Sequence, residues 1–186
     1  MKVYENIEIE FKSKVTQELY YELLERFNLE NNVFKQTNYY FDTPDLKLNK
    51  DKVVLRIRQK GENYKVTLKS QSEFGAHENH VLLTKEKALD MIENGFKIKD
   101  FFDDYDYDVT LRASLVNYRA KTFYPGGSLF IDKCEYCGLI DYEIEFEVDN
   151  YEEGYKAWIE LLKENNVTLT PTRRKSERAL TCSSKK

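Results

Sequence analysis

A short charged segment near the N-terminus carries the residue types of a metal and anion site. The segment Glu8-Ile9-Glu10-Phe11-Lys12 alternates charged and apolar side chains. Successive side chains of an extended strand point to opposite faces, so Glu8, Glu10 and Lys12 share one face. Two carboxylates beside an ammonium group can hold a divalent cation together with an anionic ligand. The segment therefore predicts a strand that contributes to such a site.

The same alternation recurs in four later segments. On any one strand, a charged face is typical of a surface exposed to solvent. If the sheet closes on itself, however, these faces converge, and a charged interior is stable only when acids and bases pair or a ligand and metal complete the network. The polar positions are Arg56 and Arg58, then Lys65, Thr67 and Lys69, then Asn117, Arg119 and Lys121, and finally Glu143, Glu145 and Glu147.

The residue types on these faces select one class of ligand. Arginine and lysine donate hydrogen bonds to phosphate oxygens, and arginine can do so through two parallel bonds. Glutamate supplies the hard oxygen ligands that suit Mg²⁺ or Mn²⁺. The combination fits a metal-bound polyphosphate better than a bare anion or a bare metal ion.

The pattern along the chain predicts an α+β protein with enough strands to close an antiparallel barrel. Connections are short, which favours antiparallel neighbours. Thr16 and Thr84 are expected to cap helices at their N-termini, and Gly95 to end one. We expect strands over 4–14, 33–42, 52–60, 63–70, 76–83, 109–123, 128–135 and 140–149, and helices from Thr16 to about Asn28, over 84–94 and over 151–165.

Composition limits the class of protein. A chain of 186 residues is most simply a single domain, here 1–186. The net charge of −4 argues against a general nucleic-acid binder, which would show a basic excess. Three cysteines are too few for a disulfide framework, and neither a membrane span nor a signal peptide is evident. These features predict a cytoplasmic protein that binds neither nucleic acid nor membrane, and they leave monomer and homodimer open.

The charged segments also resemble a known family. Glu8-x-Glu10-x-Lys12 resembles the ExExK signature of the CYTH domain, the triphosphate tunnel metalloenzymes. The later charged positions follow in the order of that family, and the resemblance runs from about residue 3 to about residue 180. The segments Asn38-Tyr39-Tyr40-Phe41-Asp42-Thr43 and Asp141-Tyr142-Glu143-Ile144-Glu145 are most similar to its small bacterial single-domain branch.

The resemblance implies an eight-stranded antiparallel β-barrel, or triphosphate tunnel, with flanking helices and a bound Mg²⁺ or Mn²⁺. It implies catalytic roles for Glu8, Glu10 and Lys12. It also implies two larger sets of ligands. Phosphate oxygens would be bound by Lys12, Arg56, Arg58, Lys69, Arg119 and Lys175, and the metal by Glu8, Glu10, Asp132, Glu143 and Glu145. Asp132 has the alternative role of orienting a basic neighbour, and Arg178 accompanies Lys175 as a C-terminal basic candidate.

The function that follows is a divalent-metal-dependent triphosphatase acting on a small triphosphate-containing substrate. Inorganic triphosphate is favoured, because the charged residues account for a phosphate chain and nothing obvious accounts for a base or a thiazolium ring. An adenylyl cyclase that converts ATP to cyclic AMP is the first alternative, and a thiamine triphosphatase another. A non-catalytic polyphosphate or nucleotide sensor and a structural β-protein with solvated faces remain possible.

Two other motifs are less consistent with a site. Cys134 and Cys137 have CxxC spacing, but in a strand they point to opposite faces and few partner ligands remain. His77 and His80 also fall on opposite faces of their expected strand. We interpret all four as ordinary structural residues.

Overall fold

The computed structural model describes residues 2–72 and 75–183, which form two compact units. The first unit comprises Met1–Ile7, Gln36–Leu115 and Arg174–Lys186, and the second comprises Glu8–Lys35 and Val116–Arg173. Within the described residues, no helix combines the length and apolar character needed to cross a membrane.

The strands follow the predicted segments closely. All eight predicted strands are present, with ends that differ by one or two residues because strand ends depend on pairing and not on local pattern alone. The strands are β1 (Tyr4–Val15), β2 (Phe34–Asp42), β3 (Val53–Lys60), β4 (Asn63–Ser72), β5 (Gly75–Leu83), β6 (Phe96–Lys97), β7 (Asp108–Tyr124), β8 (Gly127–Tyr136) and β9 (Leu139–Val148).

Strand pairing confirms the predicted barrel topology. The order is β2-β3-β4-β5-β1-β9-β8-β7-β6, and β2 also pairs with β7, so eight strands form a closed ring and β6 is added at β7. The β1–β9, β8–β9, β7–β8, β2–β3, β3–β4 and β4–β5 ladders are antiparallel. The fold is therefore a closed eight-stranded antiparallel barrel with flanking helices.

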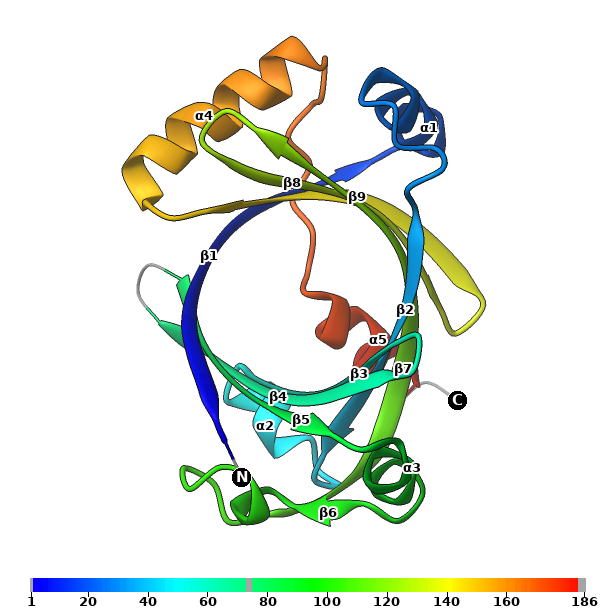
Figure 1. Ribbon diagram of the computed structural model, residues 1–186, viewed down its shortest axis with the longest axis vertical. Coiled ribbons are helices and arrows are strands. Elements are labelled where there is room, and N and C mark those ends of the chain that lie inside the picture. Colours follow the sequence, from blue (N-terminus) through cyan, green and yellow to red (C-terminus); the bar gives the residue numbers. More distant parts are fainter. Residues whose placement is uncertain (1, 73–74, 184–186) are drawn as a thin grey trace. The chain divides into compact units, whose positions relative to one another are not determined.

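Helices cover the apolar face of the strands in the second unit. Figure 1 shows α1 (Gln17–Arg26) and α4 (Tyr151–Glu164) on the same side of β8 and β9. Thr16 caps α1 as predicted, by accepting a hydrogen bond from Leu19 N. Leu23 and Trp158 pack with the apolar side chains of β1, β7, β8 and β9 in one buried cluster.

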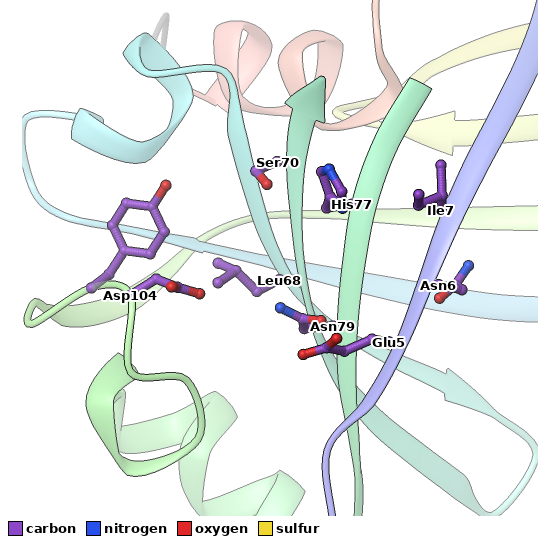
Figure 2. Close-up of a pocket in the computed structure, with 9 residues that line it drawn as sticks. Glu5, Asn6, Ile7, Leu68, Ser70, His77, Asn79 and Asp104 are labelled. Carbon is purple, nitrogen blue, oxygen red and sulfur yellow. The ribbon is translucent and has the colours of Figure 1, made fainter. Parts of the chain in front are cut away.

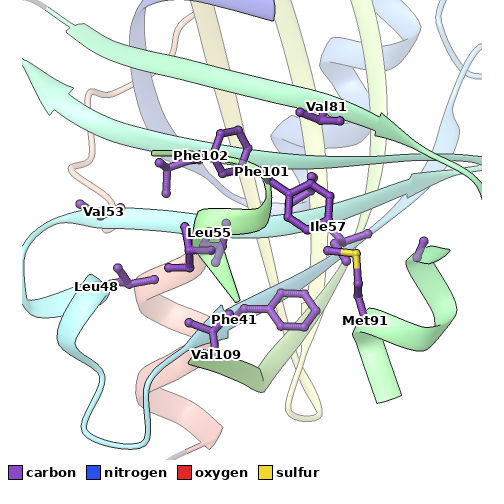
Figure 3. Packing of buried hydrophobic residues seen from close by; sticks show 14 of the residues in the cluster. Phe41, Leu48, Val53, Leu55, Ile57, Val81, Met91, Phe101, Phe102 and Val109 are labelled. Atoms are coloured by element: carbon purple, nitrogen blue, oxygen red, sulfur yellow. The ribbon is translucent and has the colours of Figure 1, made fainter. Parts of the chain in front are cut away.

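The first unit has its own apolar core. Figure 3 shows side chains of β2, β3 and β5 packed with Met91 of α3 (Lys85–Asn94) and with Phe101 and Phe102. Thr84 caps α3 by accepting a hydrogen bond from Lys87 N, and Gly95 ends it with a φ of 77°, both as predicted.

Four short elements were not predicted from the sequence. These are β6 (Phe96–Lys97), α2 (Lys47–Lys50), a 3₁₀ turn (Ile98–Asp100) and α5 (Lys175–Ser183). The N-terminus of α2 is capped from a distance, because the buried Asp42 carboxylate accepts hydrogen bonds from Leu48 N and Asn49 N, both at 2.9 Å. Asp42, the last residue of β2, thus also stabilises the start of a helical segment.

Close packing of α4 on β9 requires a glycine at position 154. A Cβ atom there would lie 2.4 Å from Val148 Cγ2 and 2.7 Å from Val148 Cβ. We expect Gly154→Ala to destabilise the protein by about 1–3 kcal/mol through overpacking, despite the better helix propensity of alanine. Thermal unfolding measures the change, with Lys156→Ala on an exposed position of α4 as the control. An unchanged or raised melting temperature for Gly154→Ala would show that α4 can shift at no cost.

Candidate active site

The strands of the second unit bury charge on the face that points away from α1 and α4. Alternation along β9 places Ile144, Phe146 and Val148 in the apolar cluster and the intervening glutamates on the other face. The charged residues of this face include Glu8, Glu10 and Lys12 of β1, Arg119 and Lys121 of β7, Asp132 of β8, and Glu143, Glu145 and Glu147 of β9. The predicted site residues of these four strands therefore share one face.

Three carboxylates on this face form a first carboxylate group, defined as Glu8, Glu10 and Glu147. One oxygen from each lies within 4.8 Å of the others. The register of β1 and β9 sets Glu10 directly opposite Glu147. Like charges in opposite positions destabilise a sheet unless a cation lies between them. Lys12 Nζ is 3.5 Å from Glu10 Oε1 and supplies one positive charge at the edge of the group.

Burial and neighbouring carboxylates affect the pKa of Glu147. Burial, a hydrogen bond with Glu8 and the charges of Glu8 and Glu145 together raise the pKa of Glu147 to about 8, against the opposing charge of Arg119. Three hard oxygen donors this close together fit Mg²⁺ or Mn²⁺.

Glu147 was not among the site residues predicted from the sequence. The alternation of β9 had placed it on the same face as Glu143 and Glu145. The family resemblance, however, assigned only Glu143 and Glu145 of this strand to the metal. The signal that identifies it is the register with Glu10, which pairing of β1 and β9 supplies and a single strand pattern does not.

The second carboxylate group comprises Asp132, Glu143 and Glu145, and it holds an arginine. Its oxygens also lie within 4.8 Å of one another. Arg119 donates two hydrogen bonds to Asp132, Nε to Oδ1 at 2.8 Å and Nη2 to Oδ2 at 2.6 Å, and Nη2 also donates to Glu145. The guanidinium lies over the Phe130 ring, with Cζ 4.4 Å from the centroid.

Electrostatics fix this arginine in its charged form. Burial alone would lower the pKa of Arg119, but the charges of Asp132 and Glu145 raise it well above its usual value. Asp132 is fully buried. Asp132 therefore binds a basic neighbour, as its alternative predicted role requires, and its part in metal binding stays a prediction.

In the first unit, the charged face is mainly cationic. Leu55 and Ile57 enter the apolar core (Figure 3). Val66 belongs to the same core, so the alternating positions lie on the opposite face. Those positions are Arg56 and Arg58 of β3 and Lys65, Thr67 and Lys69 of β4. The predicted phosphate-binding residues Arg56, Arg58 and Lys69 therefore share a face.

Neutral and acidic partners hold the cations of this face. Arg58 Nε donates a hydrogen bond to Asn38 Oδ1 at 2.8 Å. Glu78 of β5 is buried, with its carboxylate oxygens 3.8 Å from Arg56 Nη2 and 3.8 Å from Lys65 Nζ. Neither Asn38 nor Glu78 was predicted as a site residue, because neither belongs to an alternating run of charges.

The remaining predicted positions lie outside these groups. Lys175 is the first residue of α5 in the first unit, and its predicted phosphate contact stays a prediction. The Cys134 thiol donates a hydrogen bond to Asn117 Oδ1 at 3.7 Å, while Cys137 lies in the turn between β8 and β9.

A separate cavity of about 690 Å³ lies within the first unit. Figure 2 shows His77, Asn79, Leu68 and Ser70 of β4 and β5 on one side of it. None of the predicted phosphate or metal residues lines it. His77 and His80 do lie on opposite faces of β5, since His77 lines this cavity and His80 shares the face of Glu78.

Known proteins share the sequence features and the fold of this chain. The family model described as CYTH domain matches residues 6–180. The YjbK protein of Bacillus subtilis (strain 168), provisionally named a triphosphatase, is 31% identical over 180 residues, covering 92% of this chain and 93% of YjbK.

Two solved structures share the fold. A protein from Bacillus halodurans, provisionally named an adenylate cyclase, has 31% identity and a TM-score of 0.85, covering 94% of this chain and 97% of that one. HpAC1 from Hippeastrum, described as having a dominant triphosphatase activity, has 19% identity and a TM-score of 0.69, covering 96% of this chain and 95% of that one. With the closed barrel and its alternating charged faces, these matches establish that the chain belongs to the CYTH family.

Proposed function

We propose that this protein is a divalent-metal-dependent triphosphatase and that its 186 residues act as a single CYTH domain. The observation that carries the proposal is the first carboxylate group, three half-buried glutamates with one oxygen from each within 4.8 Å of the others. A relative named as a triphosphatase and a family built around triphosphate binding support the same activity.

The proposal assigns the metal to Glu8, Glu10 and Glu147. The second carboxylate group is a weaker candidate, because Asp132 and Glu145 already bind Arg119. The sequence-based assignment of Asp132, Glu143 and Glu145 to the metal stays a prediction. When bound, Mg²⁺ or Mn²⁺ would neutralise phosphate oxygens and lower the pKa of a coordinated water.

The protein residues position and neutralise the substrate. In this proposal, Arg56, Arg58 and Lys69 bind the oxygens of the phosphate chain, where they offset the negative charge that opposes attack by water. Lys12, next to Glu10, donates to the phosphoryl group that is transferred. A glutamate of the first carboxylate group accepts a hydrogen bond from the attacking water and orients it in line with the terminal phosphorus.

A substrate panel distinguishes this activity from the alternatives. We expect release of orthophosphate from tripolyphosphate or an organic triphosphate in the presence of Mg²⁺ or Mn²⁺, and no release after chelation with EDTA. Cyclic AMP with pyrophosphate as the products of ATP would instead identify an adenylyl cyclase. Metal-dependent binding measured by calorimetry without any turnover would identify a sensor.

A further inference from the structure

One row of side chains in the first unit combines a cation with neutral groups. The registers of β2, β3, β4 and β5 align Tyr40, Arg56, Thr67 and His80 across the charged face. Arg56 belongs to the proposed phosphate-binding set, whereas Thr67 and Tyr40 carry hydroxyl groups. Burial lowers the pKa of His80, and the charge of Lys65 lowers it further against the opposing effect of Glu78, so the imidazole is neutral near pH 7.

Among the residues that the structure describes, three atoms of this row have no hydrogen-bond partner. Arg56 Nε, Thr67 Oγ1 and His80 Nδ1 are all buried and unpartnered, and Thr67 is 0% exposed. More than nine-tenths of buried polar groups in proteins are hydrogen-bonded. Three exceptions on adjacent strands of one face indicate that a ligand supplies the missing partners. A phosphate can bind Arg56, but it does not need a neutral imidazole.

An aromatic side chain completes the row. The Tyr4 ring of β1 stacks on the imidazole of His80, with centroids 5.3 Å apart and an interplanar angle of 14°. Tyr4 is 39% exposed, so its ring remains accessible to a ligand. Lys2 Nζ lies 4.9 Å from the centroid of that ring. Stacking on an aromatic side chain is sequence-tolerant and suits any nucleobase.

We propose that Tyr4, Thr67 and His80 form a subsite for the nucleobase of a nucleoside triphosphate. This inference rests on the proposed triphosphatase activity and names the substrate class of the same site. Inorganic triphosphate would leave the three neutral groups unused. A cationic thiazolium ring is disfavoured, because Lys2 lies against Tyr4 and the charge of Lys65 already acts on His80.

Steady-state hydrolysis of triphosphates with and without a nucleobase tests the subsite. The substrates are tripolyphosphate, thiamine triphosphate, and ATP, GTP, CTP and UTP, each with Mg²⁺ and with Mn²⁺. For Tyr4→Leu we expect kcat/KM toward at least one nucleoside triphosphate to fall about tenfold, the scale of one base-stacking contact. Its activity toward tripolyphosphate should stay unchanged. Thr67→Val should show the same selectivity, while Tyr4→Phe and Thr67→Ser retain nucleotide activity.

Matched controls separate a local effect from a loss of folding. Tyr21→Leu replaces a tyrosine of α1 that is 52% exposed, and His77→Leu replaces the histidine on the other face of β5. Neither variant should change the activity toward any substrate. If the wild-type protein hydrolyses nothing in the panel, the proposed function itself fails. If it hydrolyses tripolyphosphate or thiamine triphosphate but no nucleotide, or if Tyr4→Leu lowers all activities equally, the nucleobase subsite is overturned.

Discussion

Glu147→Gln is expected to reduce metal-dependent triphosphate hydrolysis by at least about 100-fold at limiting Mg²⁺, the upper end of what loss of a supporting residue around a metal typically costs. Glutamine keeps the size of the side chain but cannot lose a proton to become the carboxylate that a metal requires. Glu147 lies directly opposite Glu10 and shares a hydrogen bond with Glu8. The change therefore removes one of the three carboxylates of the first carboxylate group. Phosphate release measures the activity, and calorimetry with Mn²⁺ measures the affinity.

The matched control for this variant is Glu5→Gln. Glu5 is an exposed residue of the same strand as Glu8, and it lines the separate cavity of the first unit. We expect wild-type activity and metal affinity from this control. A Glu147→Gln protein that binds Mn²⁺ and hydrolyses triphosphate as well as the wild type would remove Glu147 from the site.

Arg119→Met is expected to cause the largest loss of stability. The change leaves Asp132 and Glu145 buried without their cation, and breaking such a pair typically costs about 3–5 kcal/mol. For a chain of this size, that loss lowers the melting temperature by about 10 °C. Thermal unfolding in the presence of EDTA measures the effect without a contribution from bound metal.

The neighbouring pair Lys133–Glu135 provides the control. Lys133 is part-exposed and lies 2.7 Å from Glu135, a partly solvated ion pair of the kind that contributes about 0–1 kcal/mol. Lys133→Met should therefore change stability little.

Adding Asp132→Asn to Arg119→Met should cost less than the sum of the two single changes, because one substitution removes the charge that the other leaves unpaired. Additive losses would mean that the two side chains are not coupled.

Much of the fold follows from local pattern, because strand alternation is a property of short segments. The Glu8-x-Glu10-x-Lys12 segment and the alternating runs of β3, β4 and β9 predicted which residues share a face, and the two units bear this out. Thr16 and Thr84 predicted their helix starts for the same reason, since a capping hydrogen bond spans only three residues.

Features that depend on long-range pairing were not predictable in this way. Glu147 becomes a site residue through its register with Glu10, 137 positions away in the chain and on another strand. The α2 segment depends on the Asp42 carboxylate several residues before it. The sequence predicted Thr67 only as a polar position of a cationic strand and His80 as an ordinary structural residue. Only the aligned strands place them side by side.

The position of the metal tests the central claim most directly. Anomalous scattering from crystals grown with Mn²⁺ and a slowly hydrolysed triphosphate analogue would locate the ion. We expect a manganese peak in direct contact with carboxylate oxygens of Glu8, Glu10 and Glu147. A peak bound instead by Asp132, Glu143 and Glu145, or no ordered manganese on either carboxylate group, would contradict it.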